Sequence, residues 1–158
     1  MSVTNTSYIF KIALDTPAHV MERLCASTIL PGMLIEAYAD TTEKVRAHST
    51  ANGPAEAMFA LENSLQGEGI TDAYTTGDRV TCGVFNNGDR VYCRIANGVN
   101  CAIGSKLVSN GDGYMKLYVQ EASAAVVPVH PILQSEQAVD MSGSSGVDPE
   151  GFCIASVI

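Results

Sequence analysis

The stretch GDRVTCGVFNNGDRVYCRIANG, residues 77–98, contains one hexapeptide almost twice. The sequence Gly-Asp-Arg-Val-Thr-Cys at 77–82 returns as Gly-Asp-Arg-Val-Tyr-Cys at 88–93. Each copy begins with a Gly-Asp turn signal and continues into residues that favour β-strands. The dipeptide Asn87-Gly88 between them is typical of a two-residue hairpin turn. We therefore expect two short strands joined into one antiparallel hairpin.

In such a hairpin Cys82 faces Cys93, and a longer loop would shift this register. Three interpretations of the two cysteines compete. A zinc site needs four ligands at knuckle-like spacing, which this stretch lacks. A disulfide is sterically open, but the N-terminal sequence shows no secretory signal, and reduced thiols are usual without one. We favour the third interpretation, in which two small apolar side chains pack in a core.

The rest of the chain shows the same punctuation of short apolar runs by Gly, Asn and Asp. We expect further strands near 33–38, 44–48, 101–108, 114–119 and 152–158. Residues 52–66 fit either a short helix or a buried strand at 58–61, and two prolines in 122–133 favour an edge strand or a connector. The predicted fold class is all-β, a compact β-barrel or β-tulip-like domain of short antiparallel strands with at most one short helix.

The first 28 residues differ in pattern from the remainder of the chain. Alternate apolar side chains at Tyr8, Phe10, Ile12 and Leu14 precede a proline. We expect residues 1–28 to form an extended N-terminal arm and residues 29–158 to form a single β-domain. The alternative is that residues 1–28 supply an ordinary edge strand of the same domain.

Composition excludes several classes of partner. The chain has 46% hydrophobic and 16% charged residues and a formal net charge of −8. Its nine Lys and Arg residues are not clustered, so we expect no nucleic-acid partner. The longest apolar stretch, residues 122–129, is too short to cross a bilayer, and we expect no membrane partner.

No motif nominates a catalytic, cofactor or metal site. GEGITD at 67–72 lacks the third glycine of a dinucleotide-binding loop. In a twelve-residue calcium loop built around SNGDGYMKLY at 109–118, valines would occupy the first and the last position, where calcium ligands are needed. His19, His48 and His130 stand far apart in the sequence. We therefore expect no enzyme activity and no cofactor. One alternative is a small β-barrel carrier or ligand-binding module, since Met-Lys-Leu around Lys116 is faintly like the modified lysine of biotin carriers.

A longer block is more distinctive than any of these motifs. It resembles the capsid decoration (cement) proteins and other small structural proteins of tailed-bacteriophage heads. The resemblance spans roughly residues 31–119. The matching positions are Pro31-Gly32, Leu34, Glu36, Val45, His48, Phe59-Ala60-Leu61-Glu62, Gly67, Gly69-Ile70, Tyr74, Gly77-Asp78, Gly88-Asp89, Ile103-Gly104, Leu107, Ser109 and Gly111-Asp112-Gly113. The cysteines at 82, 93 and 101 depart from the apolar residues expected there.

The resemblance implies a non-catalytic virion protein, made in the host cytoplasm, that binds the outer surface of an assembled capsid. It implies two partners, the major capsid protein and further copies of this chain in a homotrimer or other small homo-oligomer. The capsid-contact candidates are the arm residues Tyr8, Phe10, Ile12 and Leu14. A decoration protein, a head-fibre base and another minor head protein remain open alternatives.

Overall fold

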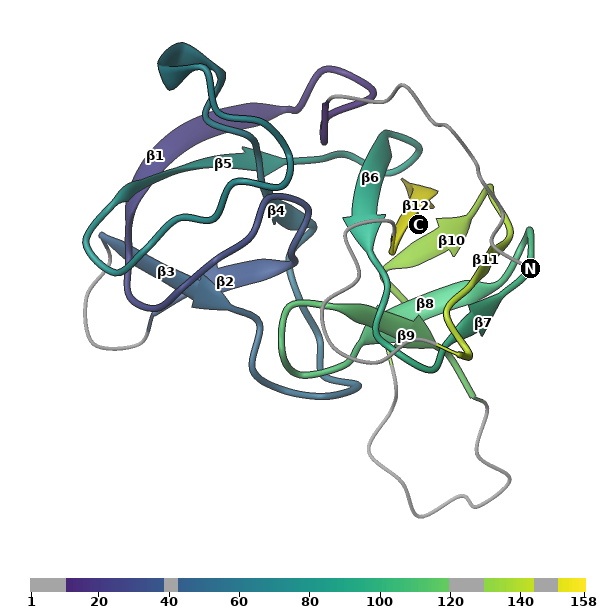
Figure 1. The fold of residues 1–158 in the computed structure, drawn as a ribbon. Coiled ribbons are helices and arrows are strands. Elements are labelled where there is room, and N and C mark those ends of the chain that lie inside the picture. The colour runs from purple at the N-terminus through teal and green to yellow at the C-terminus, as the bar shows by residue number, and fades with distance from the viewer. Residues whose placement is uncertain (1–10, 39–42, 120–129, 144–150) are drawn as a thin grey trace.

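The computed structural model describes residues 11–38, 43–119, 130–143 and 151–158. These residues form twelve strands and one 3₁₀ turn, arranged as two neighbouring five-stranded sheets with a small two-stranded sheet beside the second (Figure 1). The elements are β1 His19–Cys25, β2 Ile35–Ala37, β3 Lys44–Ala47, β4 Met58–Ala60, η1 Ser64–Gln66, β5 Arg79–Val84, β6 Arg90–Arg94, β7 Asn100–Cys101, β8 Lys106–Ser109, β9 Met115–Leu117, β10 Leu133–Ser135, β11 Val139–Asp140 and β12 Phe152–Val157.

The first sheet contains the first five strands in the order β2-β3-β1-β5-β4. Its central strand is β1, which pairs antiparallel with β5 and parallel with β3. The β1–β5 ladder is the longest of this sheet and runs from His19↔Val84 to Leu24↔Arg79. Residues 19–25, which we expected in an N-terminal arm, thus lie in the middle of a sheet.

The second sheet is built mainly from the C-terminal half, in the order β6-β12-β10-β8-β9. The strand β12, near the C-terminus, inserts between β6 and β10 and pairs antiparallel with both. The short strands β7 and β11 pair with each other, with Cys101 opposite Val139. The sheet topology therefore depends on pairing between segments far apart in the sequence.

The nearly all-β fold class is confirmed, with η1 as the single helical turn in the described residues. Over the residues described, each five-stranded sheet has one isolated bridge between its two edge strands, and neither bridge extends into a ladder. Leu34↔Phe59 joins the β2 and β4 sides, and Ile95↔Met115 joins the β6 and β9 sides. Both five-stranded sheets are open in their strand order. The predicted barrel or tulip shape is not confirmed.

The predicted hairpin of β5 and β6 is wrong, although both strands exist within a residue or two of their expected bounds. The two strands belong to different sheets. Cys82 pairs with Met21 and Ala60, and Cys93 pairs with Cys153. The connecting loop bonds elsewhere, since Gly88 N donates to Val157 O at 2.7 Å. The distant strand β12 thus takes the position beside β6 that the predicted hairpin assigned to β5.

Residues 52–66 contain a buried strand and not a helix of ordinary length. Met58, Phe59 and Ala60 of β4 are all buried. The turn η1 comes next and ends at Gly67, whose φ of 74° lies in the left-handed region that glycine adopts most readily.

Two clusters of buried apolar side chains make up the core. The smaller cluster lies within the first sheet and includes Val45, Val80 and Cys82. The larger cluster belongs mainly to the second sheet, but Leu34 and Phe59 from the first half of the chain contribute to it. Phe59 is fully buried. Because both halves fill one cluster, the two sheets are held together by shared apolar burial.

Candidate interaction surface

The arm residues proposed for capsid contact fall into two groups. Tyr8 and Phe10 lie outside the described residues. Ile12 is fully buried in the larger core cluster, and Leu14 is half-buried against it. In this structure Ile12 therefore faces the interior of its own chain, and its side chain is not presented to a partner.

Residues 12–15 are attached to the free side of β6 by backbone contacts. Ala13 forms an isolated antiparallel bridge with Val91, and Tyr92 N donates to Ile12 O at 2.8 Å. Asp15 accepts hydrogen bonds from the Arg90 guanidinium at 3.1 and 3.3 Å. The side-chain hydrogen bond from Arg90 lowers the pKa of Asp15. This segment covers a sheet edge that would otherwise present unpaired backbone groups.

The first sheet presents a solvent-facing strip along β1 and β5. Directly opposite residues in an antiparallel ladder share one face, and the register places Glu22 against Thr81 and Leu24 against Arg79. Val20 continues the strip and is 59% exposed. We call these five residues the β1–β5 outer face.

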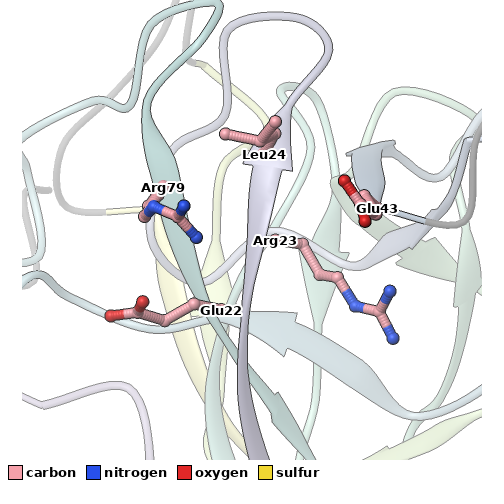
Figure 2. A pocket seen from close by; sticks show the side chains of 5 residues that line it. All are labelled: Glu22, Arg23, Leu24, Glu43 and Arg79. Atoms are coloured by element: carbon pink, nitrogen blue, oxygen red, sulfur yellow. The ribbon is translucent and has the colours of Figure 1, made fainter.

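The β1–β5 outer face carries charges of both signs around shallow hollows. Figure 2 shows one hollow, with Glu22 and Arg79 on one side of β1 and Arg23 and Glu43 on the other. A second hollow shares Glu22 and Arg79 and extends to the loop that carries η1. Its volume is about 400 Å³. The strip therefore combines one exposed apolar side chain, Val20, with charges of both signs.

The loop with η1 projects from the body of the molecule beside this strip (Figure 1). Leu65 at its centre is 93% exposed. A leucine this exposed gains nothing from the fold of its own chain, and it lines the second hollow together with Gln66 and Glu68. Leu65 thus adds a second exposed apolar side chain beside the β1–β5 outer face.

Sequence reasoning missed this surface because β1 was assigned to an arm. Its signal was present but weak: Val20, Glu22 and Leu24 alternate with Met21, Arg23 and Cys25 at the period of a strand. Both sets mix apolar and charged residues, so the alternation does not show which set is buried. The ladder to β5 supplies that information.

Two buried polar side chains have structural partners. His48 Nδ1 lies 2.7 Å from Ser109 Oγ, and His48 Nε2 lies 3.2 Å from Pro54 O. Arg94 is 2% exposed and donates to Pro31 O at 2.7 Å and Ile70 O at 2.9 Å. Each links separate segments of the chain.

The fold does not bring His19, His48 and His130 together. His19 begins β1 and is exposed, and His130 lines a different hollow beside Pro131 and Ile158. Among the described residues, no group of three His, Cys, Asp or Glu side chains is placed to hold a metal ion.

All five cysteines are buried and free: Cys25, Cys82, Cys93, Cys101 and Cys153. Their burial confirms the packing interpretation for Cys82 and Cys93, although the two lie in different core clusters. Lys116 lies within β9 and is half-buried, while the turn before that strand is formed by residues 110–113. No helix in the described part of the chain is long and apolar enough to cross a membrane.

Comparison with known proteins gives a likeness in fold. No family model matches the sequence, and no curated protein matches it. Among solved structures, the chain is similar to the N base of the head fiber protein gp8.5 of bacteriophage phi29, with a TM-score of 0.57 at 9% identity. The match covers 89% of this chain and 93% of that chain. At this identity the likeness shows a shared fold.

Proposed function

We propose that this chain is a structural protein of a bacteriophage head, and that it binds the outer surface of the assembled capsid. The observation that carries the proposal is the likeness in fold to a phage head fiber base over most of both chains. The sequence resemblance to small phage head proteins over residues 31–119 is consistent with this likeness, and no family model matches the sequence.

We propose further that the protein cements the shell, that it acts without catalysis or cofactor, and that copies of the chain assemble as a trimer or other small homo-oligomer. The acidic net charge of −8 keeps free copies dispersed by mutual repulsion. Several copies bound to one lattice then gain affinity from simultaneous contacts. The partner on the shell is the major capsid protein.

For the contact itself we propose the β1–β5 outer face together with Leu65. Exposed Val20 and Leu65 supply the apolar area that a partner would cover, and the flanking charges supply orientation. Ile12 is no longer a contact candidate in this proposal, because burial removes it from the surface.

The test uses the purified full chain and capsids of the phage that encodes it. We expect saturable co-sedimentation with expanded capsids and a higher temperature of capsid disruption when the chain is bound. Absence of binding to its own capsid would overturn the proposed function. If the chain bound the capsid without raising its stability, the assignment as a head protein would stand and the cementing role would be wrong.

The contact face is tested separately with Val20→Asp and Leu65→Asp. Each should weaken capsid binding by about tenfold or more, which corresponds to about 1.4 kcal/mol. Ile103→Asp is the matched control, since Ile103 is 73% exposed between β7 and β8. If the control weakens binding and the two test variants do not, the contact lies on the second sheet.

A further inference from the structure

A group of buried side chains on β7, β10 and β12 brings two thiols to one hydroxyl. Cys101 Sγ lies 3.1 Å from Ser135 Oγ, and Cys153 Sγ lies 3.1 Å from the same oxygen. The two sulfurs are therefore no more than about 6.2 Å apart, the sum of these distances. Cys101 is 1% exposed, and Cys153 and Ser135 are 0% and 2% exposed.

Ser135 is the centre of a group of hydrogen bonds that includes both thiols. Ser135 Oγ donates its proton to Gln137 O at 2.5 Å. The same oxygen then faces both thiols and the Gln137 amide, whose nitrogen lies 3.3 Å away. The thiols also have backbone carbonyls within reach, Gln137 O at 3.7 Å from Cys101 Sγ and Ile154 O at 3.4 Å from Cys153 Sγ. The shared hydroxyl therefore holds the two sulfurs close together inside the fold.

We propose that Cys101 and Cys153 form an oxidisable dithiol, and that their sulfurs join in a disulfide when the protein meets a peroxide. The proposal is independent of the virion role. The site is defined by the two thiols that share the Ser135 hydroxyl. The oxidant is hydrogen peroxide.

The reaction balances in two steps. The Cys101 thiolate attacks one peroxide oxygen, the O–O bond breaks, and the departing hydroxide takes up a proton to give water. The resulting sulfenic acid has its sulfur beside Cys153. The Cys153 sulfur then attacks the Cys101 sulfur, the S–O bond breaks, and the hydroxide leaves as water with the Cys153 proton. Two thiols and one peroxide give one disulfide and two waters.

The local electrostatics assign the attacking sulfur. The hydrogen bond from the Cys153 thiol lowers the pKa of Cys101, and the same interaction raises the pKa of Cys153. Burial raises the pKa of Cys93, whose sulfur lies 3.5 Å from Cys153 O. Because the thiolate is the nucleophile, Cys101 reacts first and Cys93 stays protonated.

A buried thiol needs a path to the oxidant, and the fold provides one at β7. The β7–β11 ladder contains only the pairs Val139↔Cys101 and Asp140↔Asn100. Short ladders open locally at low free-energy cost, without unfolding of the rest of the molecule. Cys153 is instead held between β6 and β10 in the five-stranded sheet. A disulfide would therefore tie the small sheet to the large one.

The experiment treats the folded full chain with hydrogen peroxide, blocks the remaining thiols and maps peptides without reduction. We expect one linked peptide pair containing Cys101 and Cys153 and loss of two of the five thiols. In the absence of reductant, the oxidised protein should melt about 5–10 °C higher, because the bond closes a long loop of the unfolded chain. Dithiothreitol should reverse both changes.

Four variants sharpen the test. Cys101→Ser and Cys153→Ser should each abolish the linked peptide, whereas Cys82→Ser, in the other core cluster, should leave it unchanged. Ser135→Ala keeps both thiols and should shift the pH dependence of the oxidation rate. A linked peptide of Cys93 and Cys153, oxidation without any link, or no reaction in the folded protein would each overturn the proposal. If a variant fails to fold, the peptide map of the wild-type protein still shows whether Cys101 and Cys153 become linked.

Discussion

Arg94 places a cation in the interior, where its direct partners are backbone carbonyls. Its guanidinium bonds Pro31 O and Ile70 O and lies over the Phe152 ring at 4.4 Å. Burial lowers the pKa of Arg94. The fork of N–H donors suits two carbonyls from separate loops, which a single ammonium group would serve less well. Arg94 thus fastens the turn before β2 and the loop before β5 to the second sheet.

Arg94→Met should lower the free energy of unfolding by about 2–4 kcal/mol, because it leaves two carbonyls without their charged donor. Urea unfolding followed by circular dichroism measures the change. The control is Arg90→Met, which removes a guanidinium that is half-exposed and paired with Asp15. A loss at Arg90 equal to that at Arg94 would contradict the role assigned to buried carbonyl bonding.

His48 links two strands through a side-chain contact: it lies at the end of β3 and contacts Ser109 at the end of β8. Its ring is 2% exposed, so an unpaired nitrogen there would be costly. We expect His48→Ala and Ser109→Ala to be each destabilising and strongly non-additive, with a coupling of about 0.5–3 kcal/mol in a double-mutant cycle. The same cycle between His48→Ala and Leu65→Ala should be additive, because Leu65 is 93% exposed. Additivity of the His48–Ser109 cycle would refute the link.

At the scale of elements, β2 and β3 share an ionic contact that makes their pairing depend on pH. Burial opposes ionisation of Glu36, but hydrogen bonds from Ser49 and Arg46 outweigh it and hold the pKa of Glu36 below its usual value of 4.5. The Arg46 bond measures 2.8 Å and the Ser49 hydroxyl bond 2.7 Å. Ionised Glu36 therefore stabilises the fold more than protonated Glu36 does.

The direction of this pKa shift sets the pH dependence of stability. A carboxyl whose pKa is lower in the folded state contributes stability that is present above its unfolded pKa and is lost as pH falls through the folded pKa. The difference in free energy of unfolding between the parent and Glu36→Gln should thus be largest near neutral pH and shrink between about pH 5 and pH 3. Exposed Glu136→Gln is the matched control for removal of a glutamate carboxylate. A constant difference for Glu36→Gln across this range would rule out the assignment.

The positions of the strands were largely predictable from the sequence, whereas the pairing between strands was not. Turn dipeptides and β-branched residues placed β3, β5, β6 and β12 within a few residues of their true bounds. Local sequence carries that information. Pairing is set by which distant strand buries the apolar face, and the local hairpin pattern holds no information about β12. Asn87-Gly88 favours a turn, but its amide at Gly88 bonds Val157 instead of closing β5 on β6.

The candidate surface was less predictable than the fold for a related reason. Ile12 and Leu14 looked like a free apolar stripe because sequence alone does not show that Ile12 pairs beside β6 and buries its side chain in the larger core cluster. Leu65 gave no signal, since leucine is usually buried and nothing in the sequence marks this one as exposed. Its exposure became evident only once η1 was placed outside both core clusters.

At the scale of the whole molecule, the shared core predicts that both sheets unfold together. Phe59 of β4 packs edge-on against Phe85 with ring centroids 6.0 Å apart, and it belongs to the cluster formed mainly by the second sheet. Phe59→Ala should lower the free energy of unfolding by about 3–5 kcal/mol through lost burial and a cavity. Because the cavity lies between the sheets, the loss should be felt by both.

Hydrogen exchange tests this cooperativity more directly than a global probe. In the parent and in Phe59→Ala, the most protected amides of β5 and of β12 should exchange with the same free energy, lowered equally by the substitution. Leu65→Ala should lower neither, since its side chain is 93% exposed. If β12 kept its protection while β5 lost it, the two sheets would be separate folding units. Leu34 and Phe59 would then attach to the second core without contributing to its stability, contrary to their complete burial.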